Sequence, residues 1–142
     1  MRKKTRKQID DFVVLIYNKI NDFGREEYGT MFKRKIYDNL LQWKDTSNGK
    51  TALLIEGPRR VGKSTVATEF ARNEYESFIL VDFYTASPET KALFDNLSDL
   101  NYIFLQLQLT YQVSLKERKS CIVFDEVQLC PKARQAIKAL VK

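Results

Sequence analysis

Residues 52–65 read ALLIEGPRRVGKST, which is the pattern of a buried strand, a glycine-bounded loop and the start of a helix. The segment contains the phosphate-loop spacing G-x-x-x-x-G-K-[ST], at Gly57, Gly62, Lys63 and Ser64. In such a loop, backbone N–H groups surround phosphate oxygens, the lysine reaches the β and γ phosphates, and the hydroxyl holds Mg²⁺. The helix that begins at Lys63 presents unpaired N–H groups and a positive dipole end to the anion.

We therefore predict a nucleotide site in this loop. Its expected contacts are Gly57, Pro58, Arg59, Arg60, Val61, Gly62, Lys63, Ser64 and Thr65. The two arginines could touch phosphate or equally point to solvent. A second G-K-T occurs at 49–51, but it precedes the strand and has Lys44 where the first glycine should be, which favours a simple turn.

The composition is that of one globular domain of 142 residues, with 44% hydrophobic residues. Five of its six net positive charges lie in the first seven residues. Nucleic acid binding would therefore have to use this basic tail. We favour the alternative that the tail is solvated and disordered. The chain has no histidine and two cysteines, which excludes Cys/His metal centres and a histidine base. We expect both cysteines to be reduced in a cytoplasmic protein, and no stretch approaches the roughly 20 apolar residues of a membrane span.

The amino-terminal part reads as helical. Apolar residues between Ile9 and Ile20 recur at helical spacing, and after a polar link over 25–30 a second helix is predicted from about Lys33 to Lys44. Because Met31 could be an alternative translation start, we divide the chain into a basic tail and helical extension (1–30) and the amino-terminal part of a P-loop ATPase domain (31–142).

The rest of the chain alternates strands and helices, which predicts a parallel α/β sheet. Residues 99–112 fit a helix by length, although 105–109 alternate like a strand. The elements that we expect are a helix from Lys63 to about Asn73, a strand over Phe78–Phe83, a helix that starts at Ser87-Pro88, a helix over Asp99–Gln112, a strand over Ser120–Phe124 and a helix over Pro131–Val141.

Two acidic residues, Asp125 and Glu126, come directly after the last strand. Ligands of open α/β sheets gather at the carboxyl ends of the strands, where both the phosphate loop and this pair would lie. Phosphoryl transfer requires mainly positioning and charge stabilisation. We expect Lys63 to neutralise phosphate charge, Ser64 and Asp125 to hold Mg²⁺, and Glu126 to orient and polarise the attacking water.

These residues predict Mg²⁺-dependent ATP hydrolysis, with Lys63 and Glu126 as catalytic residues. The main alternative is a regulatory switch that binds nucleotide without efficient hydrolysis, because it would use the same residues. A GTPase is disfavoured, since the sequence has no N-K-x-D motif and Asp125-Glu126-Val127-Gln128 lacks the glycine of D-x-x-G. A small-molecule kinase would need an acceptor pocket that the sequence does not indicate.

The stretches GPRRVGKST (57–65) and IVFDEVQ (122–128) resemble the AAA-type P-loop ATPases of bacteria and archaea. The segment KRKIYDNLLQW (33–43) is similar to the helix that precedes the first strand in that family. The resemblance implies a cytoplasmic ATPase that prefers ATP to GTP. It also implies a three-layer P-loop sheet of parallel strands with helices on both faces.

The chain departs from that family beyond the Asp-Glu strand. Such domains place a further strand, which carries a polar sensor residue, between the phosphate-loop strand and the Asp-Glu strand. This sequence stops before such a strand and before any assignable sensor arginine or arginine finger. We therefore expect an incomplete sheet, in which those two strands pair directly, another chain or a missing carboxyl-terminal part fills the gap, or the piece is only marginally stable.

Overall fold

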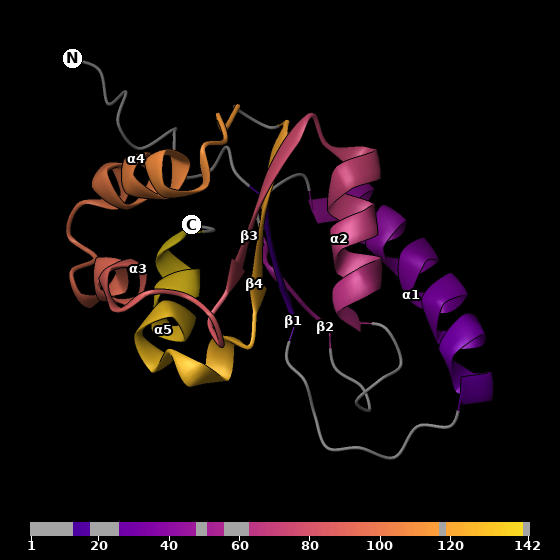
Figure 1. The fold of residues 1–142 in the computed structure, drawn as a ribbon. Coiled ribbons are helices and arrows are strands. Elements are labelled where there is room, and N and C mark those ends of the chain that lie inside the picture. The colour runs from indigo at the N-terminus through magenta and orange to yellow at the C-terminus, as the bar shows by residue number, and fades with distance from the viewer. Residues whose placement is uncertain (1–12, 18–25, 48–50, 56–62, 117–118, 141–142) are drawn as a thin grey trace.

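The computed structural model describes residues 13–17, 26–47, 51–55, 63–116 and 119–140 (Figure 1). Within this part, one sheet has the strand order β2-β1-β4-β3, and every neighbouring pair is parallel. The strands are β1 (Val13–Tyr17), β2 (Leu53–Ile55), β3 (Ser77–Asp82) and β4 (Ser120–Asp125). The predicted parallel α/β sheet is confirmed, and the two strands expected near residues 78 and 120 shift by only one residue at their ends.

Strand β1 is the main difference from the prediction. Residues 13–17 were expected inside an amphipathic helix over Ile9–Ile20, and this prediction is wrong because they form a strand. The run VVLIY is continuously apolar and rich in β-branched residues, as is typical of a strand inside a parallel sheet. The pairing of β1 with β2 and β4 therefore outweighs the helical spacing of the apolar residues in this segment.

The position of β1 also corrects the expected gap in the sheet. Leu15 is in register with Leu53 of β2 on one side and with Val123 of β4 on the other. The phosphate-loop strand and the Asp-Glu strand do not pair with each other, and the chain's own amino-terminal segment lies between them. Neither direct pairing of the two strands nor filling of the gap by another chain or a missing part is what is observed, whereas the predicted marginal stability stays a prediction.

Helices α1 (Glu26–Ser47) and α2 (Lys63–Glu74) cover one face of the sheet (Figure 1). The polar link predicted over 25–30 is wrong from Glu26 onward, since α1 starts there, whereas α2 starts at Lys63 as predicted. The Lys44 ammonium donates to the Glu74 carbonyl oxygen at 2.8 Å and lies 4.8 Å from the centre of the Tyr75 ring. These contacts fix the end of α1 on the end of α2. The buried cluster under the two helices comprises Leu40, Ile55, Val66, Ala67, Phe70, Ala71, Tyr75, Cys121 and Val123.

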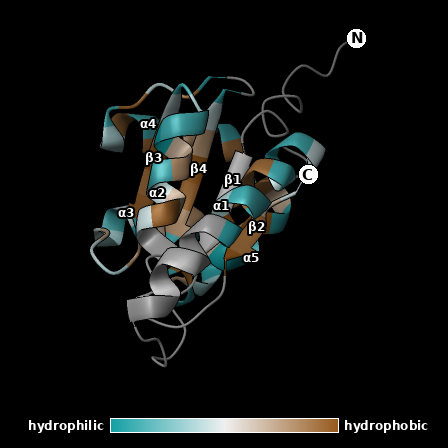
Figure 2. Ribbon diagram, turned by 90° about the vertical axis from the view of Figure 1, so that its right-hand side faces the viewer, coloured by the Kyte–Doolittle hydropathy of each residue, from teal (hydrophilic) through white to brown (hydrophobic). Residues whose placement is uncertain are grey.

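The opposite face is covered by α3 (Pro88–Ala92), the 3-10 turn η2 (Leu93–Asp95), α4 (Leu100–Tyr111) and α5 (Pro131–Leu140). Three rings, Phe83, Phe94 and Phe124, stack edge to face with centroids 5.3 to 5.8 Å apart and form the centre of this second core. Figure 2 shows the strands largely in the hydrophobic colour, whereas the coloured parts of the helices mix hydrophilic and hydrophobic residues. Helices therefore lie against both faces of the sheet.

Local capping explains where these helices start and stop. The Ser87 hydroxyl accepts from the Thr90 N–H at 3.1 Å and Pro88 is the first residue of α3, which confirms the predicted start. The Asp99 carboxylate accepts from the Tyr102 N–H at 3.0 Å, and Gln112 ends α4 in the left-handed conformation with φ of 54°. The helical interpretation of 99–112 is thereby confirmed.

Candidate functional site

The candidate site lies at the carboxyl edge of the sheet. Because all four strands are parallel, their last residues share this edge, and the register pairs Tyr17 with both Ile55 and Asp125, and Asp125 with Asp82. The amino end of α2 lies at the same edge (Figure 1). Both motifs found in the sequence therefore converge on one edge, as ligand sites of open parallel sheets do.

The phosphate loop joins β2, which ends at Ile55, to α2, which starts at Lys63. The predicted strand–loop–helix order is confirmed at both of its ends. The loop residues Gly57, Pro58, Arg59, Arg60, Val61 and Gly62 lie outside the described residues, so their predicted contacts stay predictions. Lys63 and Ser64 occupy the first two positions of α2.

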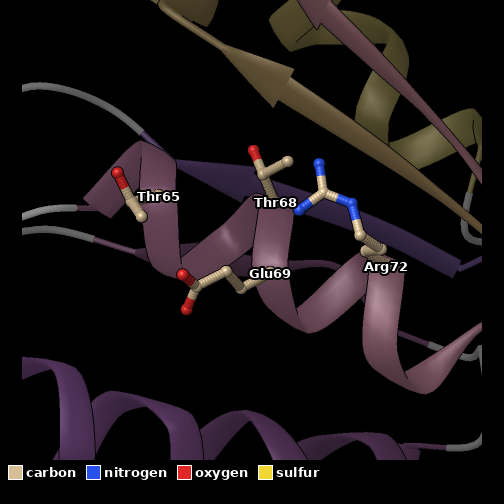
Figure 3. A pocket seen from close by; sticks show the side chains of 4 residues that line it. All are labelled: Thr65, Thr68, Glu69 and Arg72. Atoms are coloured by element: carbon tan, nitrogen blue, oxygen red, sulfur yellow. The ribbon is translucent and has the colours of Figure 1, made fainter.

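Thr65 is the first residue of α2 whose side chain is described, and it is exposed. It lines an open pocket of about 300 Å³ together with Thr68, Glu69 and Arg72. Figure 3 shows all four side chains projecting from α2, with Thr65 at the end nearest the phosphate loop. Polar, solvent-accessible space thus extends from the start of α2 along one side of the helix.

Asp125 and Glu126 are nearly enclosed at the end of β4. Their exposed fractions are 6% and 8%, among the few buried acidic side chains in the described part of the chain. The Phe83 N–H donates to the Asp125 carbonyl oxygen at 2.9 Å, so the ends of β3 and β4 are tied together. Burying a carboxylate is costly unless it is paired or hydrogen-bonded, and buried acidic groups are concentrated at functional sites, which makes this strand end a candidate site.

The backbone at Glu126 is unusual. Its φ of 58° and ψ of 40° lie in the left-handed region, which costs a residue other than glycine about 1–3 kcal/mol. A 3-10 turn, η3 (Val127–Leu129), comes directly after it, and the Gln128 side-chain amide donates to the Glu126 carboxylate at 2.6 Å. Strained backbone beside a buried carboxylate is a feature of functional sites.

Asp82 lies at the same edge of the sheet, although the sequence pattern was not used to predict it as a site residue. It is the register partner of Asp125, is half-buried, and its carboxylate accepts from the Tyr84 N–H at 3.0 Å. The signal was present, because Asp82 follows the apolar run 78–81 in the same way that Asp125 follows 121–124. Gln128 was missed because only the folded turn brings its amide to Glu126.

The donor set at this edge suits magnesium rather than a metal held by protein alone. Within the described residues, no group of three or more His, Cys, Asp or Glu side chains is placed to hold a metal ion. Nucleotide-bound Mg²⁺ uses one or two protein oxygens, with phosphates and water as its other ligands. Asp125 provides one such carboxylate at the end of β4, whereas the side chain of Ser64, the other predicted ligand, lies outside what the structure describes and its role stays a prediction.

A family model described as an AAA domain matches residues 49–142, well over half of the chain. The matched range runs from just before β2 to beyond α5 and includes both stretches from which a nucleotide site is predicted, 57–65 and 122–128. The chain belongs to the AAA domain family. The resemblance to AAA-type P-loop ATPases is thereby confirmed, and this AAA domain is nucleotide-binding and ATPase-like in kind.

No curated protein and no solved structure matches the chain significantly. The assignment to the AAA domain family therefore rests on the sequence match. The fold is the one given by the described residues. In the part of this AAA domain that the structure covers, no helix combines the length and apolar character needed to cross a bilayer.

Proposed function

We propose that this AAA domain binds ATP with Mg²⁺ and hydrolyses it at the carboxyl edge of a three-layer P-loop sheet. The observation that carries the proposal is the burial of Asp125 and Glu126 at the end of β4, on the same edge as the start of α2. Bound Mg²⁺ would supply charge neutralisation between the β and γ phosphates.

The roles of the chain's own residues derive from their positions. Gly57 to Thr65 would surround the phosphates, and Lys63 would neutralise their charge at the first turn of α2. Ser64 and Asp125 would be the protein ligands of Mg²⁺. Glu126 would accept a proton from the attacking water, because its carboxylate comes directly after the metal-binding residue at the strand end.

We also propose a cytoplasmic location. Cys121 and Cys130 are both free and buried, as expected of a protein from a reducing compartment. The domain boundary predicted near residue 31 is based on the sequence pattern, whereas β1, from the segment before it, pairs with two strands of the sheet.

The main competing function is a nucleotide switch that binds ATP without efficient hydrolysis. Binding and turnover separate the two, so the test compares the wild-type chain with Glu126→Gln. We expect Glu126→Gln to keep the ATP affinity within about twofold and to lower single-turnover hydrolysis by about 100-fold or more. Glu89→Gln, which changes an exposed glutamate of α3, is the matched control and should leave both quantities unchanged.

Turnover that Glu126→Gln leaves intact would remove Glu126 from the mechanism. Tight ATP binding without wild-type turnover would favour the switch. We further propose that efficient hydrolysis needs an additional segment or a second chain, because phosphoryl transfer often uses an arginine supplied in trans. If a second copy of the chain supplies this arginine, specific activity should rise with protein concentration, and a constant value would rule out that source.

A further inference from the structure

The left-handed backbone at Glu126 does not have the usual explanation. The other described non-glycine residue with positive φ is Gln112, and it caps the carboxyl end of α4, where this conformation is common. Glu126 instead lies between a strand and a 3-10 turn. The conformation must therefore be maintained by the contacts of the adjoining turn.

That turn is fixed by two backbone hydrogen bonds and one buried side chain. The Leu129 N–H donates to the Glu126 carbonyl oxygen at 3.0 Å, and the Cys130 N–H donates to the Val127 carbonyl oxygen at 3.0 Å. Val127 is 1% exposed and belongs to the core that contains Phe124. Residues 126–130 therefore form a rigid corner between β4 and α5.

Gln128 is exposed, yet its side chain turns back toward the buried carboxylate. Its amide nitrogen donates to Oε2 of Glu126 at 2.6 Å. Holding an exposed glutamine side chain in one place costs rotamer entropy. The hydrogen bond to the Glu126 carboxylate must offset that cost. The end of a glutamate side chain rotates freely about its last bond, and this contact restrains that rotation.

We propose that Gln128 is a positioning residue that sets the orientation of the Glu126 carboxylate for hydrolysis. The inference rests on the proposed function, since it gives Glu126 the role of base. A base must hold its oxygen within hydrogen-bond reach of the water it activates. Gln128 holds one carboxylate oxygen and thereby fixes where the other one points.

The kinetic test uses two variants that remove the donor in different ways. Gln128→Ala removes the side chain, and Gln128→Met keeps its approximate length without a donor or a charge. We expect each to lower kcat about tenfold while KM and the ATP dissociation constant stay within about twofold. Gln135→Ala, which changes an exposed glutamine of α5, is the matched control and should behave as wild type.

Two kinetic results would overturn the proposal. An unchanged or increased kcat in Gln128→Ala would show that the bond is irrelevant or holds Glu126 away from the water. A loss of ATP affinity as large as the loss of kcat would make Gln128 a structural residue.

A second readout does not depend on turnover. In ¹⁵N-labelled protein, the side-chain amide signals of Gln128 should shift toward those of a solvated glutamine in Glu126→Ala, while those of Gln135 stay in place. Signals of Gln128 that do not respond would overturn the restraint. If the wild-type chain binds ATP without hydrolysing it, the proposed function is wrong, and so is the role of Glu126 as base. The amide signals would still test whether Gln128 restrains the Glu126 carboxylate.

Discussion

Tyr17, the last residue of β1, is the register partner of Asp125, the last residue of β4. Tyr17 also pairs in register with Ile55, the end of the phosphate-loop strand. The ends of β4 and β2 are therefore positioned relative to each other through a strand of five residues from the amino-terminal part of the chain. The sheet, and with it the site, depends on that strand.

Leu15→Pro tests this dependence. Leu15 lies at the middle of β1 and has partners on both sides, so a proline removes a ladder N–H in the interior of the sheet. We expect a loss of about 3 kcal/mol or more in the free energy of unfolding, measured by urea denaturation. Leu15→Ile, which keeps the ladder N–H and the side-chain volume, is the control and should cost less than about 1.5 kcal/mol. Equal stability of Leu15→Pro and wild type would mean that β1 does not hold the sheet together.

Much of the fold could be predicted because local signals agreed with the tertiary structure. Alternating strands and helices from residue 51 onward carry their own caps and apolar runs, and Ser87-Pro88 started α3 as the sequence indicates. The phosphate-loop spacing and the acidic pair after β4 were likewise visible as residue types at fixed positions. These two motifs lie at one edge of the sheet because all of its strands are parallel.

The amino-terminal part could not be predicted in the same way. The run 13–17 satisfies both a helical period and a buried strand, and only the two edges of β2 and β4 decide between them. Similarly, Gly29 and the polar residues around it favour a link, whereas they lie within α1. The contact between Gln128 and Glu126 depends on the left-handed backbone of Glu126. A glutamate at that position does not predict this conformation.

Phe94→Ala tests the core that supports the acidic strand. Phe94 is 1% exposed and lies between the rings of Phe83 and Phe124, so truncation leaves a cavity next to the end of β4. We expect a loss of about 3–5 kcal/mol in the free energy of unfolding. Tyr84→Ala, at a side chain that is 76% exposed, should change it by less than about 0.5 kcal/mol. Comparable effects of the two substitutions would argue against this packing.

Glu76 makes stability depend on pH. Its hydrogen bond with Lys116, together with the charges of Lys119 and Lys116, lowers the pKa of the Glu76 carboxyl below its usual 4.5. A lowered folded-state pKa means that the contribution is complete above the unfolded value and is lost as pH falls through the folded value. Glu76→Gln should therefore unfold at a slightly lower temperature than wild type at pH 7, with no difference near pH 2.

Salt provides the control, since the Glu76 side chain is 49% exposed and its ion pairs with Lys116 and Lys119 are screened by salt. The difference at pH 7 should shrink in 1 M NaCl. A difference that persists at low pH or in high salt would assign the effect to packing instead of charge.

Cys121 should be inert in the folded protein. The side chain is fully buried in β4, and burial raises the pKa of its thiol, so the reactive thiolate is suppressed at neutral pH. Iodoacetamide labelling followed by peptide mass spectrometry should modify Cys121 only as fast as the chain unfolds. Cys130, which is 6% exposed and lines an open pocket beside Pro131, should react sooner. Faster labelling of Cys121 than of Cys130 would contradict the described core.

The most direct measurement is a calorimetric titration of the whole chain with ATP in the presence of Mg²⁺, comparing wild type, Lys63→Ala and Lys50→Ala. Lys50 belongs to the second G-K-T, which precedes β2, and so serves as the matched lysine control. We predict saturable binding by wild type and Lys50→Ala, with affinity at least about tenfold weaker in Lys63→Ala because a charge-assisted phosphate contact is lost. Equal affinity of all three proteins, or no binding by wild type, would contradict a nucleotide site at the start of α2.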